Sequence, residues 1–340
     1  MNIKYLVNLK IDKQSYILIW NIIIILNGIF IYNIENILPE KYFYDSYSII
    51  EAIKFQDYSH FDISYMITAK IFSIFNFEKL RSYNMVLYFI SLLFFIPYLY
   101  KNYSSKFYLT FFNGVFLFLT SIYLIRPGKE MLQLFIIVLC YQFEKLSPLF
   151  LIIGGILFRR YLIIQGIIFI GLKFYLKRKN KILWGILILV LIVIFTIKFP
   201  KVVKLVLGVR EKTNLHRLES SDARTIISDC LDKDGLIFLY INYFINTLRL
   251  LFPIELLVKG VEYFPYVVFQ IWFTKKLWNW KIIKNDKVIL LYSFILISGV
   301  FEPDFGSFLR HTVPYFIIIL FRHQSRGEKI EKSISNHSYL

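Results

Sequence analysis

The chain alternates between long apolar runs and short clusters of charged residues. Apolar residues make up 57% of its 340 residues, and Phe and Tyr alone number 35 and 25. A soluble core of this length needs far less apolar surface, whereas a run of about 20 apolar residues is long enough to cross a bilayer as a helix. The pattern therefore predicts an all-α polytopic membrane protein, and it excludes disordered, collagen-like and disulfide-rich chains.

The apolar runs predict about ten transmembrane helices in a single domain, residues 1–321. Two runs, 131–143 and 148–158, are too short for separate perpendicular crossings, so we expect a broken or re-entrant pair there. Residues 236–273 predict one full crossing and one in-plane or re-entrant segment. The other predicted crossings are 16–34, 83–100, 107–125, 161–172, 182–199, 288–301 and 312–321.

The basic residues indicate the orientation of the chain. Lys and Arg number 40 against 23 Asp and Glu, a formal net charge of +17, and they gather in short loops. Such loops anchor a membrane protein on the cytoplasmic side, so we do not expect nucleic-acid binding. With the N-terminus inside, the dense clusters at 173–181 and 275–287 fall in the cytoplasm, and so does a polar C-terminal tail at 322–340. The loops at about 35–82 and 200–235 then face outward.

The segment RPGKE, residues 126–130, opens a predicted helix. Proline suits the first helical position, and the N–H groups and positive dipole end of a helix start favour an anion. Arg126 and Lys129 add positive charge there, which predicts a site for a diphosphate that arginine binds bidentately. Glu130 is a candidate general base, or a residue that orients the two basic side chains.

Three polar residues in an otherwise apolar run, Asn242, Asn246 and Arg249, share one helix face because they recur at i, i+4 and i+7. Such a stripe is costly in lipid, so we expect it to line a polar cavity or to contact another helix. Glu255 follows after a proline turn and is a candidate ion-pair partner for Arg249. Structural pairing and substrate contact both stay open for Arg249.

Residues 302–311, EPDFGSFLRH, place two acids, an arginine and a histidine between two apolar runs. Asp304 is a candidate helix cap, with Ser307 three residues further on. Arg310 is a candidate phosphate ligand, and His311 can move a proton near neutral pH.

Further ionisable residues fall at the predicted outer ends of crossings, where a charged group usually faces a cavity or a partner. These secondary candidates are Arg159, Arg160, Glu255, Glu302 and, in the first outer loop, Asp45. Cys140 and Cys230 lie far apart in different settings and indicate no disulfide framework. No motif for a metal or a cofactor occurs in the sequence, and we expect neither.

Three stretches, 126–130, 249–255 and 302–311, resemble the O-antigen polymerases of the Wzy type, and the third is the most specific. The related EpsG-like polysaccharide polymerases are similar in layout. The resemblance implies a GT-C-like glycosyltransferase in the inner (cytoplasmic) membrane of a Gram-negative bacterium, active at the periplasmic face. It would transfer the growing glycan from undecaprenyl diphosphate to an incoming repeat unit on the same carrier.

The resemblance also implies roles and partners. The candidates to bind the diphosphate are Arg126, Lys129, Arg249 and Arg310. The candidates for the base that takes the proton of the acceptor hydroxyl are Glu130, Asp304 and His311. The implied partners are the undecaprenyl-diphosphate-linked oligosaccharide, membrane lipid, a chain-length regulator and the repeat-unit flippase.

Three other functions stay open. An O-antigen ligase would use similar chemistry and a similar fold. A flippase for lipid-linked oligosaccharides would favour charged residues through the bilayer depth and internal repeats, which the sequence does not show. A GT-C glycosyltransferase that transfers single sugars would use Asp45 as its key acid.

Overall fold

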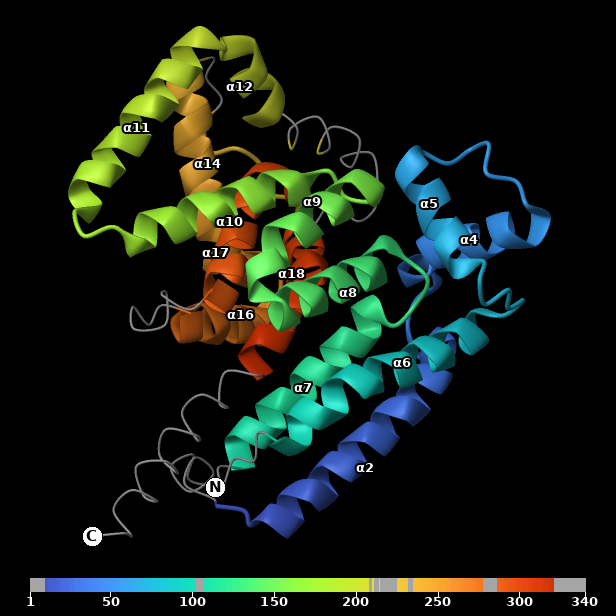
Figure 1. The fold of residues 1–340 in the computed structure, drawn as a ribbon. Helices are drawn as coiled ribbons and strands as arrows, with labels where there is room; N and C mark the ends of the chain where they lie inside the picture. The colour runs from blue at the N-terminus through green and yellow to red at the C-terminus, as the bar shows by residue number, and fades with distance from the viewer. Residues whose placement is uncertain are drawn as a thin grey trace, which may run out of the picture. The chain divides into compact units, whose positions relative to one another are not determined.

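A computed structural model describes residues 10–101, 107–207, 210, 214, 225–231, 235–277 and 286–320 (Figure 1). Within these ranges every regular element is a helix, and the extended pairing is one isolated bridge between Ile226 and Asp304. The prediction of an all-α chain is thus confirmed. The predicted tail at 322–340 and residues 278–285 of the second basic cluster lie outside the described residues.

The chain divides into two compact units. Unit 1 comprises Met1–Leu139, Leu157–Arg159 and Val313–Leu340, and unit 2 comprises Cys140–Ile156 and Arg160–Thr312. The helices that begin in unit 1 are α2 (Lys13–Tyr32), α3 (Ile34–Ile37), η1 (Glu40–Tyr42), α4 (Tyr44–Phe55), α5 (Ile63–Phe72), α6 (Leu80–Lys101), α7 (Phe107–Leu124) and α8 (Lys129–Gln142). Those that begin in unit 2 are η2 (Glu144–Leu146), α9 (Ser147–Leu157), α10 (Tyr161–Lys177), α11 (Lys181–Lys198), α12 (Pro200–Leu207), α14 (Leu236–Leu251), α15 (Leu256–Lys259), η4 (Val261–Tyr263), α16 (Phe264–Leu277), α17 (Asp286–Phe301) and α18 (Phe305–Leu320).

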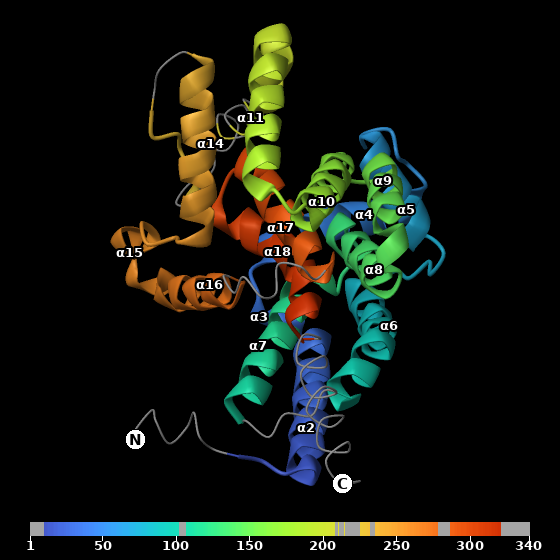
Figure 2. The ribbon, with the colours of Figure 1, turned by 60° about the vertical axis from the view of Figure 1, so that its left-hand side comes forward.

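In unit 1, α2 packs against α6 and α7, and Figures 1 and 2 both show these three helices side by side. Apolar contact is supplemented by polar bonds between the helices. The fully buried Asn27 of α2 donates to Ser121 Oγ of α7 at 2.7 Å. The Tyr88 hydroxyl of α6 donates to the Ile24 carbonyl of α2 at 2.6 Å. A buried amide or hydroxyl is tolerated only when it is bonded, so these pairs specify which helix faces meet.

The stretch 35–82 of unit 1 contains two further helices, α4 and α5, which pack on each other. Helix α4 buries Ile49, Ile50 and Ile53 on one face, the spacing expected of an amphipathic helix. Helix α4 also contacts the segment before α8, because Ser46 Oγ donates to the Pro127 carbonyl at 2.8 Å.

In unit 2, α17 is the most buried helix and packs against α10 and α14. The close approach of α14 depends on Gly299, because a Cβ there would collide with the Thr247 hydroxyl and lie 2.9 Å from the Tyr243 ring. The Tyr243 hydroxyl donates to the Leu296 carbonyl of α17 at 2.9 Å. Gly235, at φ 143°, precedes α14 in a backbone conformation that other residues rarely adopt.

The residues 236–273 form α14, α15, η4 and α16. Helix α14, at 16 residues, is apolar but shorter than the helices that pass the length criterion for a crossing, so the predicted crossing there stays a prediction. Figure 2 shows the chain turn sharply between α14 and α16 at α15. The break falls at Pro253, which supplies no N–H to continue the helix.

Among the described residues, three helical segments are long and apolar enough to cross a membrane: Lys13–Tyr32, Leu80–Pro97 and Lys181–Lys198. The pair Lys129–Gln142 and Glu144–Leu157 passes the same criterion together, with a bend of 120°, so the predicted broken pair is confirmed. By length and composition, the described part of the chain thus holds three candidate spans, or four if the bent pair counts as one, which indicates a membrane protein.

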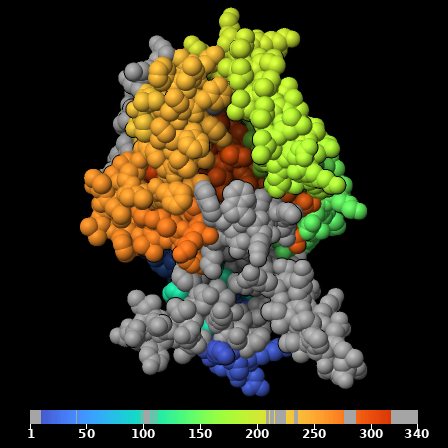
Figure 3. All heavy atoms as spheres, turned by 90° about the vertical axis from the view of Figure 1, so that its left-hand side faces the viewer, coloured from blue at the N-terminus to red at the C-terminus, as the bar shows by residue number. Residues whose placement is uncertain are grey.

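Helix α11 is exposed along almost its whole length, and Thr196 is its one buried residue. Figure 3 shows this helix and α14 bordering a hollow on one face of the molecule. A long apolar helix that is exposed over most of its surface is expected to contact lipid.

The C-terminal hairpin differs from the prediction. Residues 302–311 were expected to turn, with a crossing beginning at Thr312, but α18 already begins at Phe305. Asp304 Oδ1 accepts from the Ser307 N–H at 2.6 Å, so the predicted cap is confirmed and it starts the helix seven residues earlier than the apolar run. Arg310 and His311 are therefore helical residues of α18.

Candidate functional site

The predicted site residues fall into three groups, one in unit 1 and two in unit 2. In unit 1, Arg126 is buried and donates to the backbone oxygen of Tyr42, and its guanidinium carbon lies 5.8 Å from the centroid of the Phe43 ring. The predicted anion-binding arginine is thus engaged with the first residues of the 35–82 stretch.

Lys129, the first residue of α8, meets the start of α5. Its Nζ lies 2.5 Å from Ser64 Oγ, 3.7 Å from Asp62 Oδ1 and 3.4 Å from the centroid of the Tyr65 ring. Asp62 also caps α5 by accepting from the Tyr65 N–H at 2.8 Å. Partial burial raises the pKa of Asp62, but its hydrogen bonds and the Lys129 charge outweigh that effect, so the net pKa lies below its usual value.

Glu130 forms a buried ion pair with Arg159. Arg159 Nη2 lies 2.6 Å from Glu130 Oε1, and the two side chains are 9% and 8% exposed. This contact occupies one carboxylate oxygen of Glu130. Arg160, the next residue, is exposed, and so is Asp45 on α4.

In unit 2, Glu302 and His311 face each other. Glu302 follows the last residue of α17, and its Oε1 lies 2.7 Å from Nδ1 of His311 on α18. Both residues are buried, at 3% and 9% exposure, and the Tyr161 ring of α10 lies 6.1 Å from the His311 ring between centroids. A carboxylate at one imidazole nitrogen fixes the ring and its tautomer, which is the arrangement of a general base and its orienting residue. Arg310, beside His311 in the sequence, is partly exposed.

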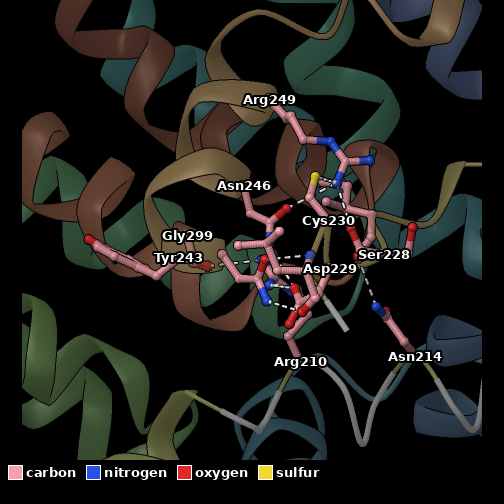
Figure 4. A network of polar contacts seen from close by, with 12 residues as sticks. Arg210, Asn214, Ser228, Asp229, Cys230, Tyr243, Asn246, Arg249 and Gly299 are labelled. Atoms are coloured by element: carbon pink, nitrogen blue, oxygen red, sulfur yellow. Dashed lines mark hydrogen bonds and ion pairs between the residues drawn. The ribbon is translucent and has the colours of Figure 1, made fainter. Parts of the chain in front are cut away.

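The polar stripe of α14 forms the second group in unit 2 (Figure 4). Asn242 and Asn246 are buried on one face, as predicted. The predicted pair of Arg249 with Glu255 is confirmed, with Nη2 at 2.8 Å from Oε1. Arg249 also donates through Nη1 to the Ser228 carbonyl at 2.5 Å. The structure thus shows the structural pairing of Arg249 that the sequence left open.

Arg210 and Asp229 form an ion pair in this group, and the sequence did not predict either residue as part of a site. Burial lowers the pKa of Arg210 although the Asp229 carboxylate opposes this, and an arginine so placed stays charged at neutral pH. The two residues are 19 apart in the sequence, too far for a helical or strand spacing to link them.

The described residues include no group of three or more His, Cys, Asp or Glu side chains placed to hold a metal ion. No family model matches the chain, and the comparisons with curated proteins and with solved structures find no match either. What the chain does is therefore inferred from its own residues.

Proposed function

We propose that the chain is a membrane glycosyltransferase that polymerises lipid-linked oligosaccharide repeat units, an O-antigen polymerase of the Wzy type. About ten crossings, a GT-C-like fold and cytoplasmic termini belong to this proposal, as does an active site at the periplasmic face of the inner membrane. The growing glycan leaves undecaprenyl diphosphate and is joined to the repeat unit on a second carrier.

The observation that carries the proposal is the buried contact of 2.7 Å between Glu302 and His311. In the proposed reaction, His311 keeps its Nδ1 proton in a hydrogen bond to Glu302, and Nε2 takes the proton of the acceptor hydroxyl. The acceptor oxygen then bonds to the anomeric carbon, while the bond from that carbon to the diphosphate breaks and its electron pair leaves with the diphosphate. Glu302 stabilises the imidazolium that forms.

Geometry favours His311 over the other two candidates for the base. Glu130 is ion-paired with Arg159, and the Asp304 carboxylate caps α18. Both carboxylates are therefore already engaged in contacts that hold the fold together.

Arg310 is the proposed ligand for the leaving diphosphate in unit 2, because a guanidinium binds phosphate bidentately and stabilises the charge that develops on it. Arg126 and Lys129 stay proposed diphosphate ligands in unit 1. A diphosphate would there compete with the contacts of Lys129 to Asp62 and Ser64.

The test is deletion of the gene in its native host, complemented with wild type or with His311→Gln, and read on a lipopolysaccharide gel. We expect the deletion and the variant to leave core that carries a single repeat, without a ladder. His60→Gln is the matched control because His60 is exposed in the loop between α4 and α5, and it should restore the ladder. Bare core would instead indicate a ligase or a flippase, and an unchanged ladder in the deletion would overturn the proposal.

A further inference from the structure

The extended residues 226–231, which we call the positioning segment, are bonded to the link between α17 and α18. The Ile227 N–H donates to the Pro303 carbonyl at 2.9 Å, and Ile226 bridges to Asp304. Ile227 is fully buried. Pro303 and Asp304 connect Glu302 to the helix that carries His311, so the positioning segment holds the backbone on which the geometry of that pair depends.

Side chains of α14 in turn form hydrogen bonds to the positioning segment. Asn246 Nδ2 donates to Asp229 Oδ1 at 2.7 Å, and Arg249 Nη1 donates to the Ser228 carbonyl at 2.5 Å. Asn242 accepts from the Leu231 N–H at 3.0 Å and donates to its carbonyl at 2.9 Å. Figure 4 shows Asn246 and Arg249 directed at residues 228–230.

A second connection runs through Arg210. Its guanidinium pairs with Asp229 and donates through Nη1 to the Gly299 carbonyl at 3.1 Å. Gly299 lies in the last turn of α17, three residues before Glu302. The positioning segment is thus tied both to the end of α17 and to the start of α18.

Both arginines of this network have a carboxylate partner within the protein. Arg249 faces Glu255, and Arg210 faces Asp229. The guanidinium of Arg249 uses Nε and Nη2 on Glu255 and Nη1 on Ser228 and on Asn246 Oδ1. Those donors hold the chain in place, which argues against a role for Arg249 in binding a diphosphate.

We infer that Asn246 and Arg249 are positioning residues that act through segment 226–231 to hold Glu302 and His311 at reacting geometry. This inference rests on the proposed function. A base displaced by about 1 Å from its reacting position loses rate by about 100-fold, so a network remote from the substrate can control the chemical step. The effect is expected on kcat, because the network changes the position of the proposed base and not the residues proposed to bind the diphosphate.

The experiment uses the full-length protein in detergent, with hydrogen exchange over residues 226–231 and in vitro polymerisation of a synthetic undecaprenyl-diphosphate-linked repeat unit. For Asn246→Ala we expect exchange at the Ile227 amide to speed up at least about tenfold, since its bond to Pro303 opens more often. We expect kcat to fall about 10- to 100-fold while KM stays within about twofold. Asn180→Ala is the matched control, because Asn180 is exposed and makes no capping bond at the start of α11.

Arg249→Lys and Asn246→Ser keep the test decisive if Asn246→Ala does not accumulate in the membrane. Each keeps a donor but weakens its bonds to the positioning segment, so we expect faster exchange at the Ile227 amide and a kcat below that of wild type; wild-type values of both would overturn the positioning role. Unchanged exchange in Asn246→Ala, or faster exchange with wild-type kcat, overturns the positioning role. If His311→Gln itself polymerises normally, the proposed function fails and the positioning role with it. If His311→Gln is inactive and Asn246→Ala is normal, only the positioning role fails.

Discussion

Arg159 Nη2 lies 2.6 Å from Glu130 Oε1, with both side chains less than a tenth exposed. Removal of one partner would leave the other charge buried without this counter-ion, which typically costs about 3–5 kcal/mol. We therefore expect Arg159→Ala to lower the thermal midpoint of the purified protein sharply. The double variant Arg159→Ala with Glu130→Ala should recover part of the loss, because no buried charge then remains at the pair.

The neighbouring Arg160 supplies the control for that measurement. Its side chain is exposed, so Arg160→Ala is expected to change the free energy of unfolding by less than about 0.5 kcal/mol. Equal effects of Arg159→Ala and Arg160→Ala would show that burial of the pair does not govern its contribution.

The second prediction concerns the bond between Asn27 and Ser121 in unit 1. Both residues are fully buried, and the bond of 2.7 Å joins α2 to α7. Ser121→Ala removes the acceptor and leaves the Asn27 amide without this bond, which we expect to cost about 1–3 kcal/mol. Ser73→Ala is the control, because Ser73 bonds within its own helical turn near the surface. Denaturation midpoints that do not differ between the two variants would contradict the prediction.

The third prediction uses two helical glycines. Gly299→Ala places a methyl group against Thr247 and Tyr243, so α14 and α17 must move apart, with an expected cost of about 1–3 kcal/mol. Gly171→Ala in α10 meets nothing within 4 Å and should be neutral or stabilising by up to about 1 kcal/mol, since alanine favours the helix. The thermal midpoint should therefore fall for Gly299→Ala and stay the same or rise for Gly171→Ala. Equal midpoints would contradict the prediction.

Short-range sequence patterns predicted much of the candidate site. The spacing of Asn242, Asn246 and Arg249 fixed their common face, and the short range from Arg249 to Glu255 made that pair visible. The cap at Asp304 was also visible as a local motif. The pair of Arg210 with Asp229 and the bond of Ile227 to Pro303 join residues far apart in the sequence, where no periodicity relates them.

The predicted start of the last helix, at Thr312, is wrong because α18 begins at Phe305. Hydropathy placed it at Thr312, because Arg310 and His311 interrupt the apolar run. The cap at Asp304 and the burial of His311 against Glu302 outweigh that pattern, since both polar groups find partners inside unit 2. A polar residue marks a helix end only when no buried partner is available to it.

The fourth prediction is a pH dependence at the start of α5. The pKa of Asp62 is lowered in the folded protein, so its ionised form stabilises the fold above the unfolded pKa of about 3.9. That contribution is lost as pH falls through the folded value. We expect Asp62→Asn to lower the thermal midpoint slightly at neutral pH, because the Asp62 side chain is 64% exposed. The difference from wild type should narrow below about pH 4, and a constant difference across pH would contradict this account.

The last prediction separates charge from geometry at Arg310. In the proposed reaction its guanidinium binds the leaving diphosphate through two parallel hydrogen bonds, which a lysine ammonium cannot reproduce. Loss of a charge-assisted bond typically costs about 1.5–3 kcal/mol, so we expect Arg310→Ala to reduce the polymerisation rate about 10- to 100-fold or more. Arg310→Lys keeps the charge and should fall between wild type and Arg310→Ala. Arg178→Ala is the control, because Arg178 is an exposed residue just after α10 that contacts aromatic rings. A rate for Arg310→Lys equal to that of Arg310→Ala would mean that two-point binding decides the step, and wild-type rates in both variants would remove Arg310 from the diphosphate site.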